Sequence, residues 1–267
     1  MHNLKYIFSA AIISIVLNNS IFAQKAKKEA DNVQIPSTAT NDNSYSLEEK
    51  ILKDALKYGD LNVAKQSLYK MIALKPENKN LKDSLAFVYI NLGSLQQAIL
   101  LSREILETTP DNVSILEVKA IAEQNLGLAK EALTSYESLH SKSKNVYHLY
   151  QIATLQYDLK RLAECNASID AILTSPEVEK KELNIGTGTR GEQQKVVLKA
   201  AALNMKGVLA MDLNENTIAK VCFDEALKLT PDFVLAKNNA TFLTNKLKTN
   251  ASETKKPMSK PNQNSNK

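Results

Sequence analysis

The chain has 267 residues, of which 43% are hydrophobic and 24% are charged, with three histidines, two cysteines and no tryptophan. This composition fits one or two globular domains and excludes a disulfide-framework protein. The formal charge of +5 does not indicate a nucleic-acid-binding surface, because the excess lies in residues 246–267, which hold six lysines and one glutamate. The central part of the chain is nearly neutral, whereas nucleic-acid binding needs a clustered positive surface.

The N-terminal residues 1–23 have the pattern of a secretory signal peptide. Lys5 precedes the apolar run YIFSAAIISIVL, and Ala23 is a small residue at the expected cleavage site. The run is too short to span a bilayer, which needs about 20 apolar residues. We expect cleavage after Ala23, export of the chain, and a polar, disordered leader over residues 24–45. The alternative is an uncleaved or buried N-terminal helix.

An internal period of 34 residues organises residues 46–248. Gly59, Gly93 and Gly127 are each 34 residues apart. Each unit has the pattern of an amphipathic helix, a break at the glycine, a second amphipathic helix and a turn. Pro110 is expected to end the second helix of its unit, because proline cannot donate to the helical hydrogen-bond ladder.

These units resemble the tetratricopeptide repeat (TPR). The residues that match its signature are Gly59, Ala64, Leu68 and Pro76, then Leu85, Ala86, Tyr89, Ala98 and Pro110, then Ala120, Gly127, Ala132 and Tyr136, then Ala153 and Pro176, and finally Gly207, Ala219, Phe223, Ala226 and Pro231. In the fourth unit Lys160 replaces the break glycine and Cys165 replaces the alanine of the second helix. The resemblance implies an all-α, TPR-type helix-turn-helix solenoid of about five repeats over residues 46–248.

An insertion over about residues 177–196 separates the fourth and fifth units. Its glycines, within residues 186–191, have the spacing G-x-G-x-x-G of a dinucleotide-binding turn. Such a turn needs a parallel strand before it and a helix after it in a βαβ unit, which helical repeats do not offer. We therefore predict a surface loop or a small β-hairpin formed by residues 181–185 and 193–198.

After the fifth unit, residues 232–248 predict one more amphipathic helix, which caps the exposed face of the last repeat. Residues 249–267 are polar and rich in lysine, so we expect a disordered basic tail.

The sequence contains no recognisable set of catalytic, cofactor-binding or metal-binding residues. His140 and His148 have no cysteine or acidic ligand at the spacing of a metal site. Cys165 stands where a repeat packs an alanine, and a disulfide to Cys222 would need Cα atoms within about 7 Å, so we expect two free thiols. We predict that the protein is not an enzyme.

In the TPR family, the first helix of each pair lines a concave surface that binds extended peptides or partner helices. By matching positions, the resemblance implies a protein-binding groove formed by Asp83, Phe87, Ile90, Asn91, Glu117, Ile121, Gln124, Asn125, Tyr150, Thr154, Tyr157, Asp158, Asn204, Val208 and Met211. Its aromatic members would anchor a partner, because aromatic side chains often dominate the binding energy of protein interfaces.

These patterns together predict an exported scaffold or adaptor that binds a protein or peptide partner in the bacterial periplasm or cell envelope. One alternative is a structural envelope protein that self-associates or tethers through its lysine-rich tail. A second alternative is a nucleotide-dependent enzyme that uses the glycine loop.

Overall fold

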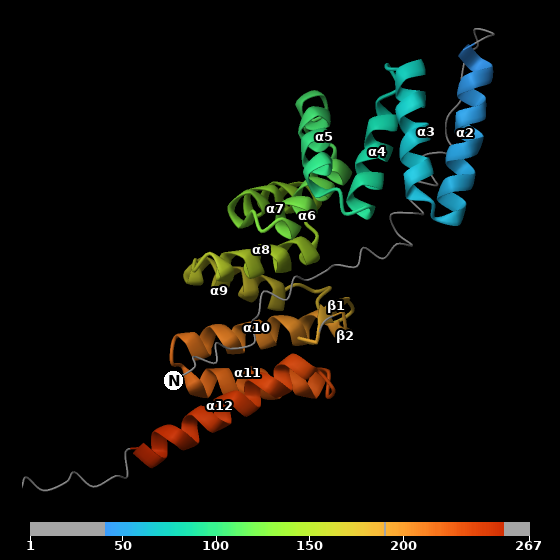
Figure 1. The fold of residues 1–267 in the computed structure, drawn as a ribbon. Helices are drawn as coiled ribbons and strands as arrows, with labels where there is room; N and C mark the ends of the chain where they lie inside the picture. Colours follow the sequence, from blue (N-terminus) through green and yellow to red (C-terminus); the bar gives the residue numbers. More distant parts are fainter. Residues whose placement is uncertain (1–40, 190, 254–267) are drawn as a thin grey trace, which may run out of the picture.

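The structure, a computed structural model, describes residues 41–189 and 191–253. Their helices are α2 (Asn41–Tyr58), α3 (Leu61–Leu74), α4 (Lys79–Asn91), α5 (Leu95–Thr108), α6 (Val113–Asn125), α7 (Ala129–Ser143), α8 (Val146–Asp158), α9 (Leu162–Leu173), α10 (Leu198–Asp212), α11 (Asn216–Leu229) and α12 (Val234–Glu253). The strands β1 (Glu182–Gly186) and β2 (Gln193–Val197) precede α10. The predicted all-α solenoid with a small hairpin before its last helices is confirmed (Figure 1).

The helices form five pairs, α2/α3, α4/α5, α6/α7, α8/α9 and α10/α11, and α12 follows the last pair. We call the first helix of each pair the A helix and the second the B helix. The helix axes turn gradually, from upright at α2 and α3 to nearly level at α8–α11 (Figure 1). Two pairs of successive A helices come into contact, α4 with α6 and α10 with α12, whereas no two successive described B helices have contact of that extent. The array therefore curves with its A helices on the inner, concave side.

The turn between the A and B helices requires one residue in the left-handed backbone region. Gly59, Gly93 and Gly127 occupy it in the first three pairs, with φ of 74°, 69° and 75°. Lys160 and Asn214 occupy the same position in the last two pairs, with φ of 62° and 61°. Glycine adopts this conformation without strain, and asparagine tolerates it better than lysine does.

The small residues of the repeat lie where two helices approach closely. The residue at the alanine position of each B helix has no exposed surface, and these residues are Ala64, Ala98, Ala132, Cys165 and Ala219. Gly207 in α10 shows why a small residue is needed, because a Cβ at this position would lie 2.5 Å from the Phe223 ring. This packing confirms the role that the repeat pattern assigns to these positions.

Two hydrophobic clusters form the core. The first runs from Tyr45 in α2 to Leu155 in α8, and the second runs from Val146 in α8 to Leu243 in α12. Val178, Ile185 and Val196 place one side of the insertion in the second cluster. The insertion is therefore part of the core of the C-terminal pairs.

The two strands pair antiparallel, with Glu182 opposite Val197 and Gly186 opposite Gln193. The tip between them contains Gly188 and Gly191, with φ of 90° and 82°. Two closely spaced residues with positive φ suit a tight hairpin connection, which explains why glycines gather here.

The boundaries of the solenoid differ from those predicted. Helix α2 begins at Asn41, so residues 41–45 of the predicted disordered leader are helical, and Tyr45 is 1% exposed. Helix α12 continues to Glu253, into the predicted tail. Both extensions are polar in sequence, so composition did not predict them as helical. In residues 41–45, Tyr45 is the one large side chain that enters the core. The predicted signal peptide, residues 24–40 and residues 254–267 lie outside the described part of the chain. None of the described helices is both long enough and apolar enough to cross a membrane.

Candidate functional site: the concave face

The predicted groove residues divide into a buried and an accessible set. The buried members, each at most 7% exposed, are Phe87, Ile90, Ile121, Tyr150, Thr154, Tyr157, Asn204, Val208 and Met211. The partly or fully exposed members are Asp83, Asn91, Glu117, Gln124, Asn125 and Asp158. The buried apolar members belong to the two hydrophobic clusters, so neighbouring helices of both kinds cover these positions of the inner face.

The predicted aromatic anchors need correction for this reason. Phe87, Tyr150 and Tyr157 are 3%, 5% and 5% exposed, so they offer a partner almost no surface. Tyr157 also donates its hydroxyl to Asp212 Oδ2 at 2.5 Å, and burial raises its pKa. These rings pack the solenoid, and any binding surface must use the polar residues around them.

Acidic side chains form a row across the first three A helices. Glu49 in α2, Asp83 in α4 and Glu117 in α6 are each 34 residues apart, and each is partly exposed. Glu49 was not among the predicted groove residues, although its spacing from Asp83 in the sequence could have revealed it. We call these three residues the acidic row.

The surroundings of Asp83 keep its carboxylate poorly solvated. Partial burial raises the pKa of Asp83, and a hydrogen bond from Asn112 partly offsets that effect. Asn112 Nδ2 donates to Asp83 Oδ2 at 2.8 Å, while its own Oδ1 accepts the backbone N–H of Ile115 and caps α6. Asn112 thus holds the carboxylate in place from the next repeat. Titratable groups with perturbed pKa values are enriched at functional sites.

Polar side chains beneath the concave face are already satisfied by one another. Ser135 Oγ donates to the buried Glu123 carboxylate at 2.6 Å, and Lys119 Nζ lies 2.7 Å from the same carboxylate. Gln124 accepts the hydroxyl of Tyr136 and donates to Gln151. These residues tie the A helix of one pair to its neighbours and are not available to a ligand without rearrangement.

One set of side chains has the composition of a hydrolase triad. Ser143 Oγ lies 2.8 Å from His148 Nδ1, and His148 Nε2 lies 3.5 Å from Glu117 Oε1. However, Ser143 Oγ also accepts the backbone N–H of Asn145 at 3.2 Å, and His148 is only 6% exposed. The set joins α6, the end of α7 and the start of α8, so we assign Ser143 and His148 to packing, whereas Glu117 is partly exposed.

The two cysteines are buried and lie apart from this set. Burial raises the pKa of Cys165 to about 12 and also raises that of Cys222. Both are buried free thiols, and a thiol with a raised pKa is a poor nucleophile near neutral pH. In the described part of the chain, no group of three histidine, cysteine, aspartate or glutamate side chains could hold a metal ion.

The glycine-rich segment does not form a nucleotide-binding turn. Its glycines lie in and after β1 and at the tip of an antiparallel hairpin, and α10 starts only after β2. A dinucleotide site requires parallel strands and a helix whose N-terminus directly follows the glycines. The G-x-G-x-x-G spacing is therefore coincidental, and the alternative of a nucleotide-dependent enzyme loses its basis.

The hairpin instead connects two distant parts of the solenoid. Tyr147 in α8 donates its hydroxyl to the Glu182 carbonyl at 2.9 Å. Gln194 Nε2 donates to the Asp232 carbonyl at 2.8 Å, and Gln194 Oε1 accepts the backbone N–H of Val234, the first residue of α12, at 2.9 Å. The insertion thus acts as a brace between the fourth pair and the terminal helix.

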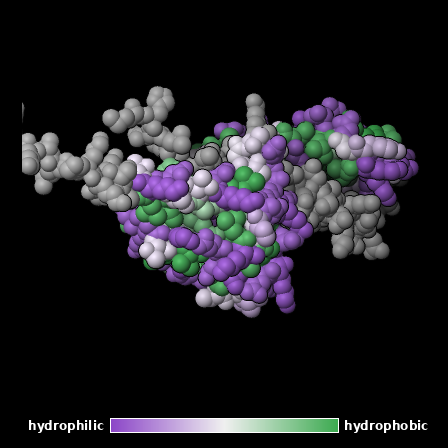
Figure 2. Space-filling model, turned by 90° about the horizontal axis from the view of Figure 1, so that it is seen from below, coloured by the Kyte–Doolittle hydropathy of each residue, from purple (hydrophilic) through white to green (hydrophobic). Residues whose placement is uncertain are grey.

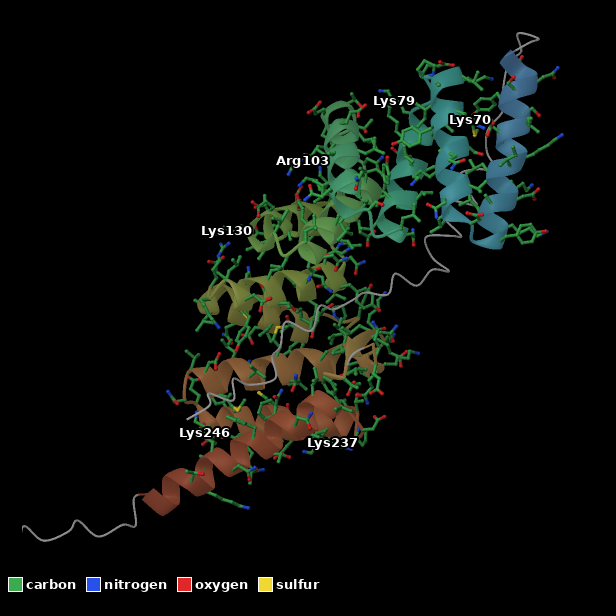
Figure 3. All side chains as sticks on the ribbon, viewed as in Figure 1. Lys70, Lys79, Arg103, Lys130, Lys237 and Lys246 are labelled. Atoms are coloured by element: carbon green, nitrogen blue, oxygen red, sulfur yellow. The ribbon has the colours of Figure 1, made fainter. Side chains whose placement is uncertain are left out.

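Six cations of the described residues are spread along the array. Lys70, Lys79, Arg103 and Lys130 project from four different helices, and Lys237 and Lys246 lie at the opposite end of the array (Figure 3). Lys70 is already paired with Glu48 at 2.8 Å.

Comparison with known proteins supports the same architecture. Residues 200–233 match the model of the tetratricopeptide repeat family. The fold is that of a TPR solenoid. The matched residues span α10, α11 and the turn to α12, and no curated protein sequence matches the chain.

Solved TPR structures resemble the solenoid at low sequence identity. A tetratricopeptide repeat protein from Parabacteroides merdae has a TM-score of 0.62 and 21% identity, over 79% of this chain and 77% of that one. YrrB, described as a TPR protein with an unusual peptide-binding site, has a TM-score of 0.58 and 15% identity, over 74% and 93% of the two chains. MamA from Desulfovibrio magneticus RS-1 has a TM-score of 0.57 and 14% identity, over 72% and 97%. At these identities the likeness establishes the fold alone.

Proposed function

We propose that this TPR solenoid is an exported, non-enzymatic scaffold of the bacterial cell envelope. Its concave face would bind an extended segment of a partner protein. TPR folds generally mediate protein–protein interactions, and YrrB, one of the similar structures, is described as having a peptide-binding site. Export is supported by the pattern of residues 1–23, with its apolar run and small residue at position 23.

The acidic row is the observation that carries this proposal. Neighbouring helices in a packed array are about 8–10 Å apart, and an extended peptide advances about 3.3–3.6 Å per residue. Because α4 and α6 are in contact, an extended segment that crosses them would meet the carboxylates of Asp83 and Glu117 about three residues apart. Lysine or arginine at that spacing would match Glu49, Asp83 and Glu117, so we propose a partner segment with regularly spaced basic residues.

A direct binding measurement tests the acidic row. The probe is a fluorescent peptide with lysine at every third position, measured by polarisation against the full chain at low salt. We expect the triple variant Glu49→Gln, Asp83→Asn and Glu117→Gln to bind at least about tenfold more weakly, and added salt to weaken the wild type.

The matched control removes the same charge from the convex side. Glu107, Glu131 and Glu137 are exposed on the B helices α5 and α7, and their triple replacement by glutamine should leave binding unchanged. Equal losses in the two triple variants would show that only net charge matters and would reject the acidic row as a site. The same two variants can then serve as baits in a crosslinked pull-down from the native envelope.

Export requires its own test. The full chain should lose its N-terminal residues in the producing cell, and N-terminal sequencing of the isolated protein should begin at Gln24. A protein that keeps Met1 and stays in the cytoplasm would reject export while leaving the peptide-binding measurement valid.

A further inference from the structure

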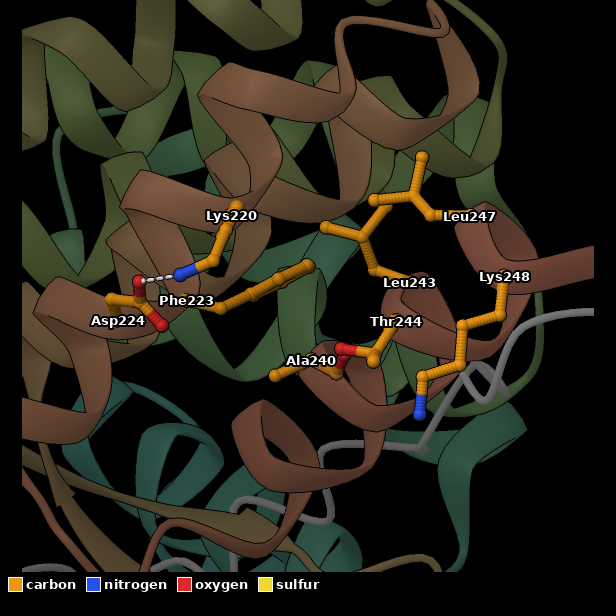
Figure 4. Close-up of a pocket in the computed structure, with 8 residues that line it drawn as sticks. All are labelled: Lys220, Phe223, Asp224, Ala240, Leu243, Thr244, Leu247 and Lys248. Carbon is orange, nitrogen blue, oxygen red and sulfur yellow. Dashed lines mark hydrogen bonds and ion pairs between the residues drawn. The ribbon is translucent and has the colours of Figure 1, made fainter. Parts of the chain in front are cut away.

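The C-terminal end of the solenoid contains an open groove. Every A helix except α12 is followed by a B helix that packs against it, and no such helix follows α12 in the described part of the chain. A pocket of about 400 Å³ lies between α11 and α12. Its lining is drawn in Figure 4 and comprises Lys220, Phe223, Asp224, Ala240, Leu243, Thr244, Leu247 and Lys248. One repeat earlier, Lys206, Leu209 and Leu213 of α10 line a smaller pocket of about 190 Å³, which Ile218 of α11 borders. No described B helix borders the pocket at α12, so that pocket is larger and open on this side.

The groove is apolar where a terminal cap is expected to be polar. A capping repeat needs a polar outer face to stay soluble, but Leu247 is 39% exposed and lies above the buried Leu243 and Phe223. Figure 2 views the molecule from this end, and patches of apolar residues lie there among hydrophilic ones. The cap helix thus leaves an apolar surface uncovered.

The rest of this chain does not supply a suitable helix. Residues 254–267 contain Pro257 and Pro261, several lysines, and only Met258 as a large apolar residue. That sequence lacks the apolar periodicity of a helix that could fill the groove. We therefore take a helix of another molecule as the occupant.

Helix α12 itself has the complementary shape. Leu247 projects as a large side chain, and the smaller residues Ala240 and Thr244 lie on the same stripe, seven and three residues earlier. In an antiparallel pair of α12 helices related by a two-fold axis near residues 243–244, each Leu247 would lie over Ala240 of the other copy. A large residue and a small one on the same stripe make the surface self-complementary, as a two-fold interface requires.

The charges around the groove favour the same arrangement. Because α11 and α12 run antiparallel through a short turn, Asp224 lies beside the Ala240 end and Lys220 beside the Leu247 end (Figure 4). In the antiparallel pair, Lys248 of each copy would approach the Ala240 end of the other, where Asp224, already paired with Lys220 of its own chain, would have a second cation beside it. The parallel arrangement would bring the two Leu247 ends together, with Lys220 and Lys248 of both copies.

We infer that the protein forms a two-fold homodimer in which a second copy of the chain covers this groove through its own α12. The dimer would leave both concave faces free, because the groove lies at the end of the array. The two peptide-binding faces would then be joined in one particle, which strengthens binding to a partner with two or more copies of the segment.

Sedimentation equilibrium of the full chain tests this inference. The wild type should sediment as a dimer, and Leu247→Lys should sediment as a monomer because it places a charge in the apolar contact. Leu100→Lys is the matched control, since Leu100 is 63% exposed on α5, and it should remain dimeric. A wild type that is monomeric up to about 100 µM, or a Leu247→Lys variant that remains dimeric, would overturn the inference.

A crosslinking measurement covers the case in which Leu247→Lys fails to fold. Thr244 lies next to the inferred two-fold axis, so Thr244→Cys should form a disulfide-linked dimer under mild oxidation. Thr134→Cys, exposed on α7, should not. Equal crosslinking of the two variants, or none at residue 244, would contradict the two-fold arrangement. Neither outcome bears on peptide binding by the acidic row.

Discussion

The first three helix pairs and the remainder of the solenoid have the same helix packing but are stabilised by different features. From α2 to α7 the period of 34 residues is unbroken, and glycine occupies each A–B turn. From α8 onward, Lys160 and Asn214 take that place and the hairpin interrupts the period. The regular half is held by repetition of local geometry, whereas the irregular half needs additional contacts between distant residues.

The hairpin provides those contacts in the C-terminal half. Its side chains enter the second hydrophobic cluster, and its hydrogen bonds reach α8 and α12. In an array of repeats, stability is approximately a sum of repeat terms and nearest-neighbour terms. The brace adds a contact beyond nearest neighbours, so we expect the C-terminal half to unfold as one cooperative unit.

The largest expected effect comes from the centre of the C-terminal cluster. Phe223 has no exposed surface, so Phe223→Ala should lower the free energy of unfolding by about 3–5 kcal/mol. Hydrogen exchange read separately for α2–α7 and α8–α12 should show the loss mainly in the second half. Equal losses of protection in both halves would show that the two clusters unfold together and would remove the distinction between them.

Gly207→Ala should lower the stability of the same cluster by about 1–3 kcal/mol. Three of the other four pairs carry alanine here, at Ala86, Ala120 and Ala153, and helix propensity alone would favour the change by about 1 kcal/mol. The Phe223 ring 2.5 Å from the new Cβ reverses that preference. Chemical denaturation in a Phe223→Leu background provides the control, where Gly207→Ala should have a smaller effect. An unchanged effect there would place the steric conflict elsewhere.

Removing the brace contact should lower the free energy of unfolding by a smaller amount. Gln194→Ala deletes two hydrogen bonds to the start of α12, and we expect a loss of about 1–2 kcal/mol together with faster hydrogen exchange in α12. Lys195→Ala on the adjacent exposed position should change neither quantity. If α12 exchanges at the wild-type rate in Gln194→Ala, the hairpin does not hold the terminal helix.

Substitutions at the A–B turns can give each half the turn residue of the other half. Lys160→Gly should stabilise the protein by about 1 kcal/mol because it relieves a left-handed lysine, and Gly127→Lys should destabilise it by a similar amount. Thermal unfolding of both variants measures the pair of shifts. Shifts of the same sign would mean that side-chain contacts outweigh backbone strain at this turn.

Asp83 should show a small, pH-dependent effect in the regular half. Its pKa is raised above the ordinary 3.8, so ionisation is less favourable in the folded chain than in the unfolded one. The contribution of the protonated form to stability is complete below the unfolded pKa and is lost as the pH rises through the folded value. Asp83→Asn should therefore be more stable than the wild type at pH 7, and the difference should shrink toward pH 4. A difference that grows on acidification would contradict this sign.

The sequence was sufficient to predict the helix pairs, because the period of 34 residues reports both the turns and the close-packed small residues. Glycine at position 59 and its two equivalents marks the A–B turns directly. The hairpin was also predictable, since helical repeats leave no role for a nucleotide-binding turn. Periodicity, however, gives only the face of the helix on which a residue lies.

The exposure of the concave face could not be predicted in the same way. Tyr150 and Tyr157 occupy groove positions by spacing, yet the closeness of neighbouring helices buries both in the second hydrophobic cluster. That closeness depends on the twist between pairs, which arises from many side chains together. The brace was hidden for a related reason, because Gln194 contacts residues about 40 positions away and no local pattern records such a contact.

The hairpin also adds residues to the chain without changing how successive helices pack. Although about 20 additional residues intervene in the sequence, α9 still packs against α10 as the other B helices pack against the next A helix. The tip at Gly188, Thr189 and Gly191 is exposed, well removed from the strand residues that enter the core. A longer sequence grafted at this tip would extend into solvent without altering the superhelix, so the solenoid has a built-in position at which new recognition elements can be added.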